Sequence, residues 1–146
     1  KYRRDRAQLQ RIAATMAEFI RGKRELVDID AIIAVPPSCM TRKWQPVAAL
    51  AESIGRLLDV PAPADYVVKT KLTPPLKNIS DGRARREELE DAFQVSDERF
   101  AGMHVLLLDD LFRSGETLSS VAGMLLSQGR VGKVSVVTAT MTRSRR

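Results

Sequence analysis

The chain has 146 residues, enough for one domain with a hydrophobic core. Hydrophobic residues make up 44% and charged residues 29%, which excludes a chain disordered throughout, and no apolar run approaches the roughly 20 residues that cross a bilayer. A single cysteine, Cys39, and a single histidine, His104, exclude an internal disulfide and argue against a histidine metal cluster or a serine–histidine triad. The net charge of +6 favours anionic partners, either nucleic acid or small phosphates.

The first half of the chain alternates predicted helices with short strands. Apolar residues recur at helical spacing over residues 5–22. The run "AIIAV" over residues 31–35 ends at two prolines and is typical of a buried parallel strand. A second helix is expected over residues 46–58, because proline is tolerated in the first turn of a helix. The stretch "ADYVVKT" over residues 64–70 then predicts another strand.

Residues 71–91 differ from what surrounds them, being polar, basic and interrupted by proline and glycine. A short helix is expected over residues 81–89 and a long loop over the rest, which in a compact domain is usually functional or mobile.

Beyond that segment the pattern of strands and helices returns. It predicts strands over residues 92–95, 104–110 and 133–141, with an amphipathic helix over residues 116–128. Strands that alternate with helices indicate an α/β domain with a mostly parallel central sheet.

The stretch "VLLLDDLFRSGETLSS" over residues 105–120 carries the clearest chemical signal. Asp109 and Asp110 follow an apolar strand, where two like charges repel each other and lose hydration, so we expect a ligand to compensate them. The loop over residues 111–117 offers hydroxyls, a glycine amide and the start of a helix, which together suit a phosphate. The alternative is a strand that simply reaches solvent, with Ser114 or Thr117 as an ordinary helix cap.

This stretch resembles the motif by which type I phosphoribosyltransferases bind phosphoribosyl pyrophosphate (PRPP), with Arg113 and Ser114 in place of two threonines. Further stretches resemble the ComF-like branch of that family: "KYRRDR", "IIAVPPS", "TRKWQPVAALAESI" and "KTKLTPPLKNISDGRARREELEDAFQV". The sequence departs from the branch pattern at Lys43, Pro46, Leu76 and Glu88. The resemblance implies one phosphoribosyltransferase-like domain over residues 1–146, without the zinc ribbon of many relatives, and with a mobile flap over residues 71–91.

The resemblance also implies site residues and a mechanism. Asp109 and Asp110 would bind the ribose hydroxyls, near Mg²⁺ that arrives on PRPP instead of on protein ligands. The 5′-phosphate would lie against Arg113, Ser114, Gly115, Glu116 and Thr117. The leaving pyrophosphate would lie against Pro37, Ser38, Arg42 and Lys43, for which a strand stop and a solvated basic turn are the alternatives. The flap would close with Lys71, Lys77, Arg83, Arg85 and Arg86, unless it is only an exposed charged loop.

Three functions stay open at this point. The first is pentosyl transfer between pyrophosphate and a nitrogenous acceptor, as in nucleotide metabolism. The second is a regulator that binds PRPP or a nucleoside monophosphate without turnover. The third is a ComF-like protein of DNA uptake in competence, which would contact nucleic acid through basic surfaces. We expect a cytoplasmic protein with no membrane contact, and a homodimer is one option.

Overall fold

The computed structural model describes residues 2–37, 44–70, 78–112 and 115–141. Its centre is a parallel sheet of three strands in the order β1 (Ala31–Ala34), β4 (His104–Phe112) and β5 (Lys133–Met141). The middle strand β4 is covered on both faces, and its residues from Val105 to Leu108 have no exposed surface. That burial explains why the strand has a continuous apolar run instead of alternating residues.

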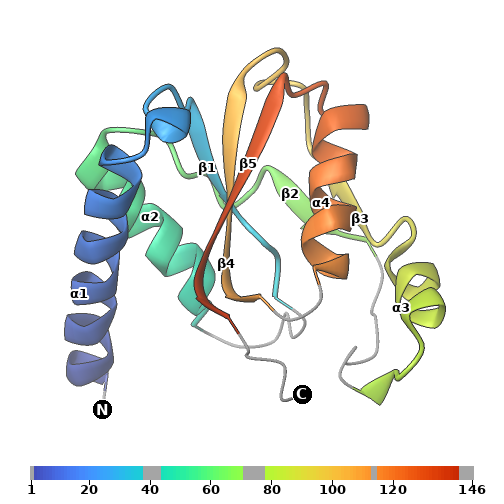
Figure 1. Cartoon of the computed structure of the whole chain (residues 1–146), viewed down its shortest axis with the longest axis horizontal. Coiled ribbons are helices and arrows are strands. Elements are labelled where there is room, and N and C mark those ends of the chain that lie inside the picture. The colour runs from blue at the N-terminus through green and yellow to red at the C-terminus, as the bar shows by residue number, and fades with distance from the viewer. Residues whose placement is uncertain (1, 38–43, 71–77, 113–114, 142–146) are drawn as a thin grey trace.

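Two helices, α1 (Tyr2–Arg21) and α2 (Pro46–Leu58), cover one face of this sheet (Figure 1). Their side chains pack with Ile32, Leu106 and Leu108 of the sheet. A short 3₁₀ helix, η1 (Arg24–Leu26), connects α1 to the segment that leads into β1. The bounds predicted for α2 and β5 are confirmed, while α1 begins three residues earlier than its predicted start.

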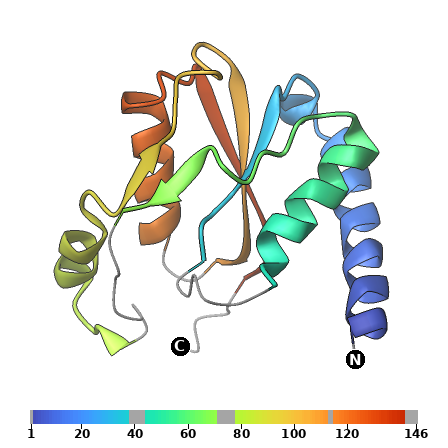
Figure 2. The same ribbon diagram turned by 180° about the vertical axis from the view of Figure 1, so that it is seen from behind.

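The other face packs against α4 (Glu116–Ser127) and against a small antiparallel pair, β2 (Val67–Lys69) with β3 (Phe93–Val95). Figure 2 shows this pair beside α4, with α3 (Gly82–Leu89) at the end of the layer. The mostly parallel sheet is thus confirmed, but β2 and β3 form a separate sheet. Pro61 accepts a hydrogen bond from the Ile32 amide, yet Pro61 and Pro63 lack the N–H that would continue a ladder along β1.

His104 is buried at the start of β4 with 5% of its surface exposed. Its Nδ1 lies 2.9 Å from Asp28 Oδ1 and its Nε2 lies 2.8 Å from Ser135 Oγ. Its backbone amide donates to Asp30 Oδ2 at 2.8 Å. The hydrogen bond to His104 lowers the pKa of Asp28. This network connects β5 and the segment before β1 to β4, so His104 has a structural role here.

In the part of the chain that the structure describes, no helix combines the length and the apolar character needed to cross a membrane.

Candidate functional site

A pocket of about 490 Å³ opens beyond the carboxyl ends of β1 and β4, where ligands bind in open α/β sheets. The reason for the hollow is a difference in strand length. The last residue of β1, Ala34, lies opposite Leu108, whereas β4 continues beside β5 to Phe112. The end of β4 therefore has a strand neighbour on the β5 side, and the pocket lies on the β1 side. Its walls come from the end of β1, the start of α2, the segment that leads into β2, and β2 itself.

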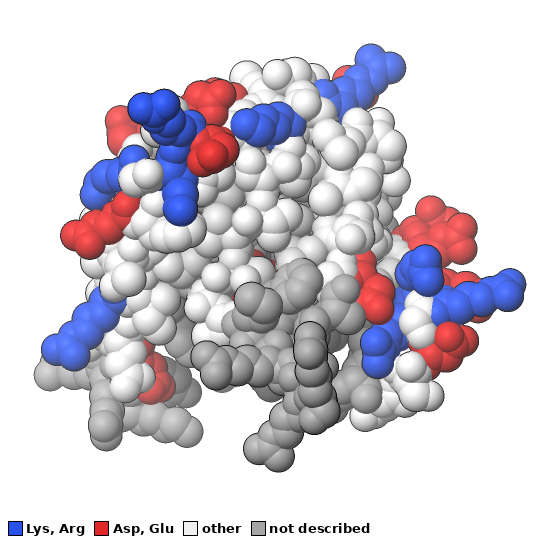
Figure 3. All heavy atoms as spheres, in the orientation of Figure 1, with Lys and Arg blue, Asp and Glu red and all other residues white. Residues whose placement is uncertain are grey.

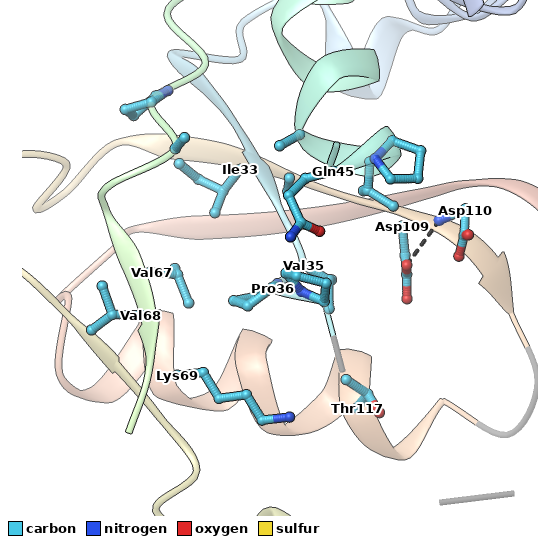
Figure 4. Close-up of a pocket in the computed structure, with 17 residues that line it drawn as sticks. Ile33, Val35, Pro36, Gln45, Val67, Val68, Lys69, Asp109, Asp110 and Thr117 are labelled. Atoms are coloured by element: carbon cyan, nitrogen blue, oxygen red, sulfur yellow. Dashed lines mark hydrogen bonds between the residues drawn. The ribbon is translucent and has the colours of Figure 1, made fainter. Parts of the chain in front are cut away.

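Both carboxylates of the predicted motif line this pocket. The Asp110 amide donates to Asp109 Oδ1 at 2.8 Å, drawn as the dashed line in Figure 4. The two residues lie inside β4 and not in the loop after it, because the strand runs on through Leu111 and Phe112. This corrects the predicted loop over residues 111–117. Asp109 pairs with Thr138 of β5, and Thr140 Oγ1 donates to the Asp110 carbonyl at 2.7 Å.

Asp109 is half-buried, and Asp110 is exposed. Burial raises the pKa of Asp109 to about 6, and the neighbouring charge of Asp110 adds to the rise, while the Asp110 amide partly opposes it. A carboxylate with this pKa is held in its charged form at a cost to the fold. A hydroxyl donor or a cation that approaches the carboxylate stabilises its charged form.

The helix after the carboxylates begins with the geometry expected of a phosphate site. Gly115 caps α4 in the left-handed region, with φ of 81°, which glycine adopts without strain. Among the described residues no side chain caps this end, so Thr117 is not the cap and instead lines the pocket. The amides of the first turn have no partner within the helix. Arg113 and Ser114, predicted for the same phosphate, lie outside the described residues.

The side chain of Glu116, the first residue of α4, has a charged partner on α3. Its carboxylate lies 3.6 Å from the Arg85 guanidinium on α3, and its Oε2 is buried without a hydrogen-bond partner among the described residues. Arg85 Nε also donates to the Ile79 carbonyl at 2.6 Å. The pair connects α3 to the start of α4.

The described arginines of the predicted flap do not line the pocket. Arg83 pairs with Glu87 at 3.1 Å, and Arg86 Nε donates to the Gly82 carbonyl at 3.4 Å. Asp81 caps α3 by accepting from the Arg83 amide. Lys71 and Lys77 lie outside the described residues, so flap closure stays a prediction.

The residues predicted for the pyrophosphate are described in part. Pro37 lines the pocket, while Ser38, Arg42 and Lys43 lie outside the described residues. The structure adds two polar residues that the sequence analysis missed, Lys69 at the end of β2 and Gln45 just before α2. Lys69 extends across the pocket toward Thr117, and Gln45 reaches in from the opposite wall (Figure 4). Burial lowers the pKa of Lys69.

Lys69 gave a weak signal in the sequence because a single lysine in a short strand is common. Its position in "VVKT", at the carboxyl end of a predicted strand, was the feature that could have identified it.

Within the described residues, no group of three or more histidine, cysteine, aspartate or glutamate side chains is arranged to hold a metal ion. The oxygens of Asp109 and Asp110 are nevertheless hard ligands of the kind that Mg²⁺ prefers. Because Mg²⁺ usually keeps several waters and binds through one or two carboxylates together with substrate phosphates, this pair fits an ion carried by the ligand.

No family model matches the chain. Competence protein F of Haemophilus influenzae is 31% identical over 106 residues, which cover 68% of this chain and 45% of that protein. The chain thus spans less than half the length of this curated relative.

Solved structures are similar over most of the chain. An adenine phosphoribosyltransferase matches 95% of this chain and 72% of its own, with a TM-score of 0.64 and 14% identity. The glutamine PRPP amidotransferase of B. subtilis, complexed with ADP and GMP, matches 90% of this chain and 26% of its own, with a TM-score of 0.60 and 15% identity. A hypothetical protein from Neisseria gonorrhoeae with bound ppGpp matches 89% of this chain and 65% of its own, with a TM-score of 0.52 and 18% identity. The chain therefore has the fold of the type I phosphoribosyltransferases, with a sequence similar to that of a competence protein F, as the ComF-like resemblance predicted.

Proposed function

We propose that the pocket binds PRPP or a nucleoside monophosphate with Mg²⁺, and that the protein is a ComF-like phosphoribosyltransferase of the cytoplasm. The observation that carries the proposal is the joint placement of Asp109, Asp110 and the first turn of α4 at one pocket. A phosphorylated ribose needs acceptors for its hydroxyls and donors for its phosphate. This pocket offers both, a few residues apart in one strand–helix unit.

Each part of the pocket would contribute one function to the reaction. The carboxylates of Asp109 and Asp110 accept hydrogen bonds from the ribose hydroxyls and stabilise the positive charge that develops on the sugar. The free amides of α4 hold the 5′-phosphate, because Gly115 lets the backbone approach it closely. Lys69 neutralises the pyrophosphate on the opposite wall. Mg²⁺, when bound, would neutralise further charge on the leaving group.

Transfer of the phosphoribosyl group replaces one bond at the anomeric carbon with another. A nitrogen of the acceptor forms a bond to that carbon as the bond to the pyrophosphate oxygen breaks, and pyrophosphate leaves with the electron pair. The protein contributes positioning and charge and supplies no nucleophile. The acceptor is a nitrogenous compound.

A regulator that binds the same ligand without turnover is the second candidate. The ion pairs of Arg83 and Arg85 favour it, since these arginines are engaged by Glu87 and Glu116 and not by the pocket. A role in competence, with contacts to nucleic acid, is the third candidate and has support from the name of the curated relative and from the net charge of +6.

Calorimetric titration of PRPP with MgCl₂ tests the proposed ligand. The test variant is Asp109→Asn/Asp110→Asn. The matched control is Asp59→Asn/Asp91→Asn, which removes the same charge from two exposed positions outside the pocket where asparagine tolerates the positive φ. We expect saturable binding by the wild type and the control, and at least about tenfold weaker binding by the test variant, since hydrogen bonds to charged groups contribute ~1.5–3 kcal/mol each.

Pyrophosphate release with ammonia or nucleobases as acceptors then separates the candidates. If the wild type releases pyrophosphate and the test variant does not, the result supports the transferase. If the wild type binds PRPP without releasing pyrophosphate, the result supports the regulator. Absence of PRPP binding by the wild type would overturn both. DNA binding that falls steeply with salt and survives in the test variant would instead support the nucleic-acid role.

A further inference from the structure

Helix α3 is short and strongly charged, since five of its eight residues are arginine or glutamate. Figure 3 shows acidic and basic side chains together over this helix, at the right of the view. Leu89, its one buried residue, shares a core cluster with Leu118 and Val121 of α4, and the Leu89 carbonyl accepts from Ser120 Oγ at 3.3 Å. These contacts fix only the end of α3. A helix of this length is not stable alone in water, so the position of its first half depends on other contacts.

The first half of α3 is held by the ion pair of Arg85 with Glu116, in which Arg85 Nη1 lies 3.6 Å from Glu116 Oε1. The two side chains are 26% and 18% exposed, whereas every other ion pair among the described residues has a side chain that is at least 45% exposed. Glu116 also faces the start of α3, because a side-chain carbon at Gly82 would lie 3.9 Å from its Oε1. Water screens a buried charge pair less than an exposed one, so this pair interacts more strongly than the others.

Glu116 brings a negative charge to the proposed phosphate site. It is the first residue of α4, and the amides of this first turn are the proposed donors to the phosphate. Without a ligand, a carboxylate at the start of a helix is favourable, because the helix dipole is positive there. With a phosphate at the same place, the two negative charges repel each other. Glu116 Oε2 is buried without a partner among the described residues, so a neighbouring cation has to reduce that repulsion in place of water.

We propose that Arg85 acts on the phosphate site through Glu116, as a positioning residue. Its guanidinium neutralises the Glu116 carboxylate, so that the first turn of α4 can hold a phosphate, and the same ion pair keeps the first half of α3 against α4. The two residues therefore have opposite effects on affinity: the charge of Arg85 raises it, and the charge of Glu116 lowers it. The inference rests on the proposed function for its ligand, whereas the attachment of α3 needs no ligand.

The geometry of Arg85 differs from that of a residue that contacts the ligand. Arg85 does not line the pocket, and its Nε donates to the Ile79 carbonyl at 2.6 Å. A flap arginine that bound the pyrophosphate directly would affect the binding of PRPP and not that of ribose 5-phosphate. An arginine that acts through Glu116 affects both ligands, because both carry the 5′-phosphate.

Calorimetric titration of ribose 5-phosphate and of PRPP, each with MgCl₂, measures the effect of the charges. Arg85→Gln should bind both ligands about tenfold more weakly, the order expected for one uncompensated charge near a phosphate at a protein surface. Glu116→Gln, which keeps the size of the side chain, should bind both more tightly than the wild type. The double variant Arg85→Gln/Glu116→Gln should bind about as tightly as the wild type, because the pair again carries no net charge. A purely structural pair would give losses in all three variants.

A conservative variant and a second ion pair supply the controls. Arg85→Lys keeps the charge and should recover most of the affinity that Arg85→Gln loses. Arg56→Gln and Glu52→Gln remove the same charges from an ion pair on α2 that does not line the pocket, and both should bind as the wild type does.

Hydrogen exchange of the ligand-free protein measures the attachment of α3 separately. The amides of residues 85–89 should exchange faster in Arg85→Gln, in Glu116→Gln and in the double variant than in the wild type, because each of these proteins lacks the ion pair. The double variant should thus regain affinity for the phosphate but not the protection of α3. That combination separates the charge of Arg85 from its contact with α4.

Two results would overturn the inference and leave the proposed function intact: an Arg85→Gln variant that binds both ligands as the wild type does, or a double variant as weak as Arg85→Gln. A loss for PRPP alone would assign Arg85 to the pyrophosphate instead. Unchanged hydrogen exchange in all three variants would overturn the attachment of α3. A wild type that binds neither ligand would overturn the proposed function, and the positioning role with it, even where α3 loses protection in the variants.

Discussion

Asp109 is predicted to lower the stability of the ligand-free protein. Its pKa in the fold is about 6, raised by burial and by the charge of Asp110 above the ordinary value of 3.8. Because the folded protein binds this proton more tightly than the unfolded chain does, the associated stability is fully present below pH 3.8. It is lost as the pH rises through about 6. At pH 7.5 the ionised carboxylate therefore destabilises the fold, and Asp109→Asn should remove that penalty.

The size of the effect follows from the shift. A rise of about two pKa units corresponds to at most ~3 kcal/mol. The carboxylate of Asp109 is partly exposed, and water screens part of the interaction, so we expect a gain of about 1–2 kcal/mol for Asp109→Asn at pH 7.5. For a chain of this length the gain corresponds to a rise in Tm of roughly 3–6 °C.

Thermal and urea unfolding of the ligand-free protein, without Mg²⁺, at pH 7.5 and pH 4 measure this difference. The advantage of Asp109→Asn should largely disappear at pH 4, where the wild-type carboxyl is mostly protonated. Asp110→Asn is the matched control, because Asp110 is exposed and its replacement should change stability less. A variant less stable than the wild type at pH 7.5, or equally favoured at both pH values, would refute the reasoning.

Three further predictions concern other parts of the chain. Gly115→Ala should cost about 1 kcal/mol, because alanine is strained at a φ of 81°, and calorimetry should show weaker PRPP binding. Lys69→Met should weaken binding of PRPP more than that of ribose 5-phosphate, and equal losses for the two ligands would contradict its assignment to the pyrophosphate. His104→Ala should lower the free energy of unfolding by about 2–3 kcal/mol, because it leaves a cavity and unpaired polar partners, and a change in the urea midpoint measures it. Since the bond to His104 lowers the pKa of Asp28, it contributes stability above pH 3.8 that is lost on acidification, and this acid-sensitive part should vanish in His104→Ala.

The central strand was predictable because its environment is uniform. Val105 to Leu108 are buried on both faces, so hydrophobicity alone identifies them. The separate pairing of β2 with β3 was not predicted, because residues 64–70 resemble a strand of either sheet in composition. Pro61 and Pro63 held the distinguishing information, since they cannot donate to a ladder beside β1.

The site was predictable where its residues are adjacent in the sequence. Asp109, Asp110 and Gly115 belong to one strand–helix unit, so one motif identifies them. Lys69 reaches the pocket only because β2 diverges from β1, which is a tertiary arrangement without a local signature. Arg85 is the opposite case. It was predicted to act in the flap because of its charge, and in the structure it forms an ion pair with Glu116.

The placement of the carboxylates on the central strand connects the fold to the proposed chemistry. A strand buried on both faces is the most rigid support in such a domain, and β4 continues beside β5 after β1 has ended. Asp109 is thus held by backbone pairing on the β5 side while its carboxylate lies at the pocket on the β1 side. A loop could present the same charges without desolvating them, but it would have to be ordered when the ligand binds. Here the burial of Asp109 lowers the stability of the folded protein before any ligand binds, and the raised pKa of Asp109 reflects that loss of stability.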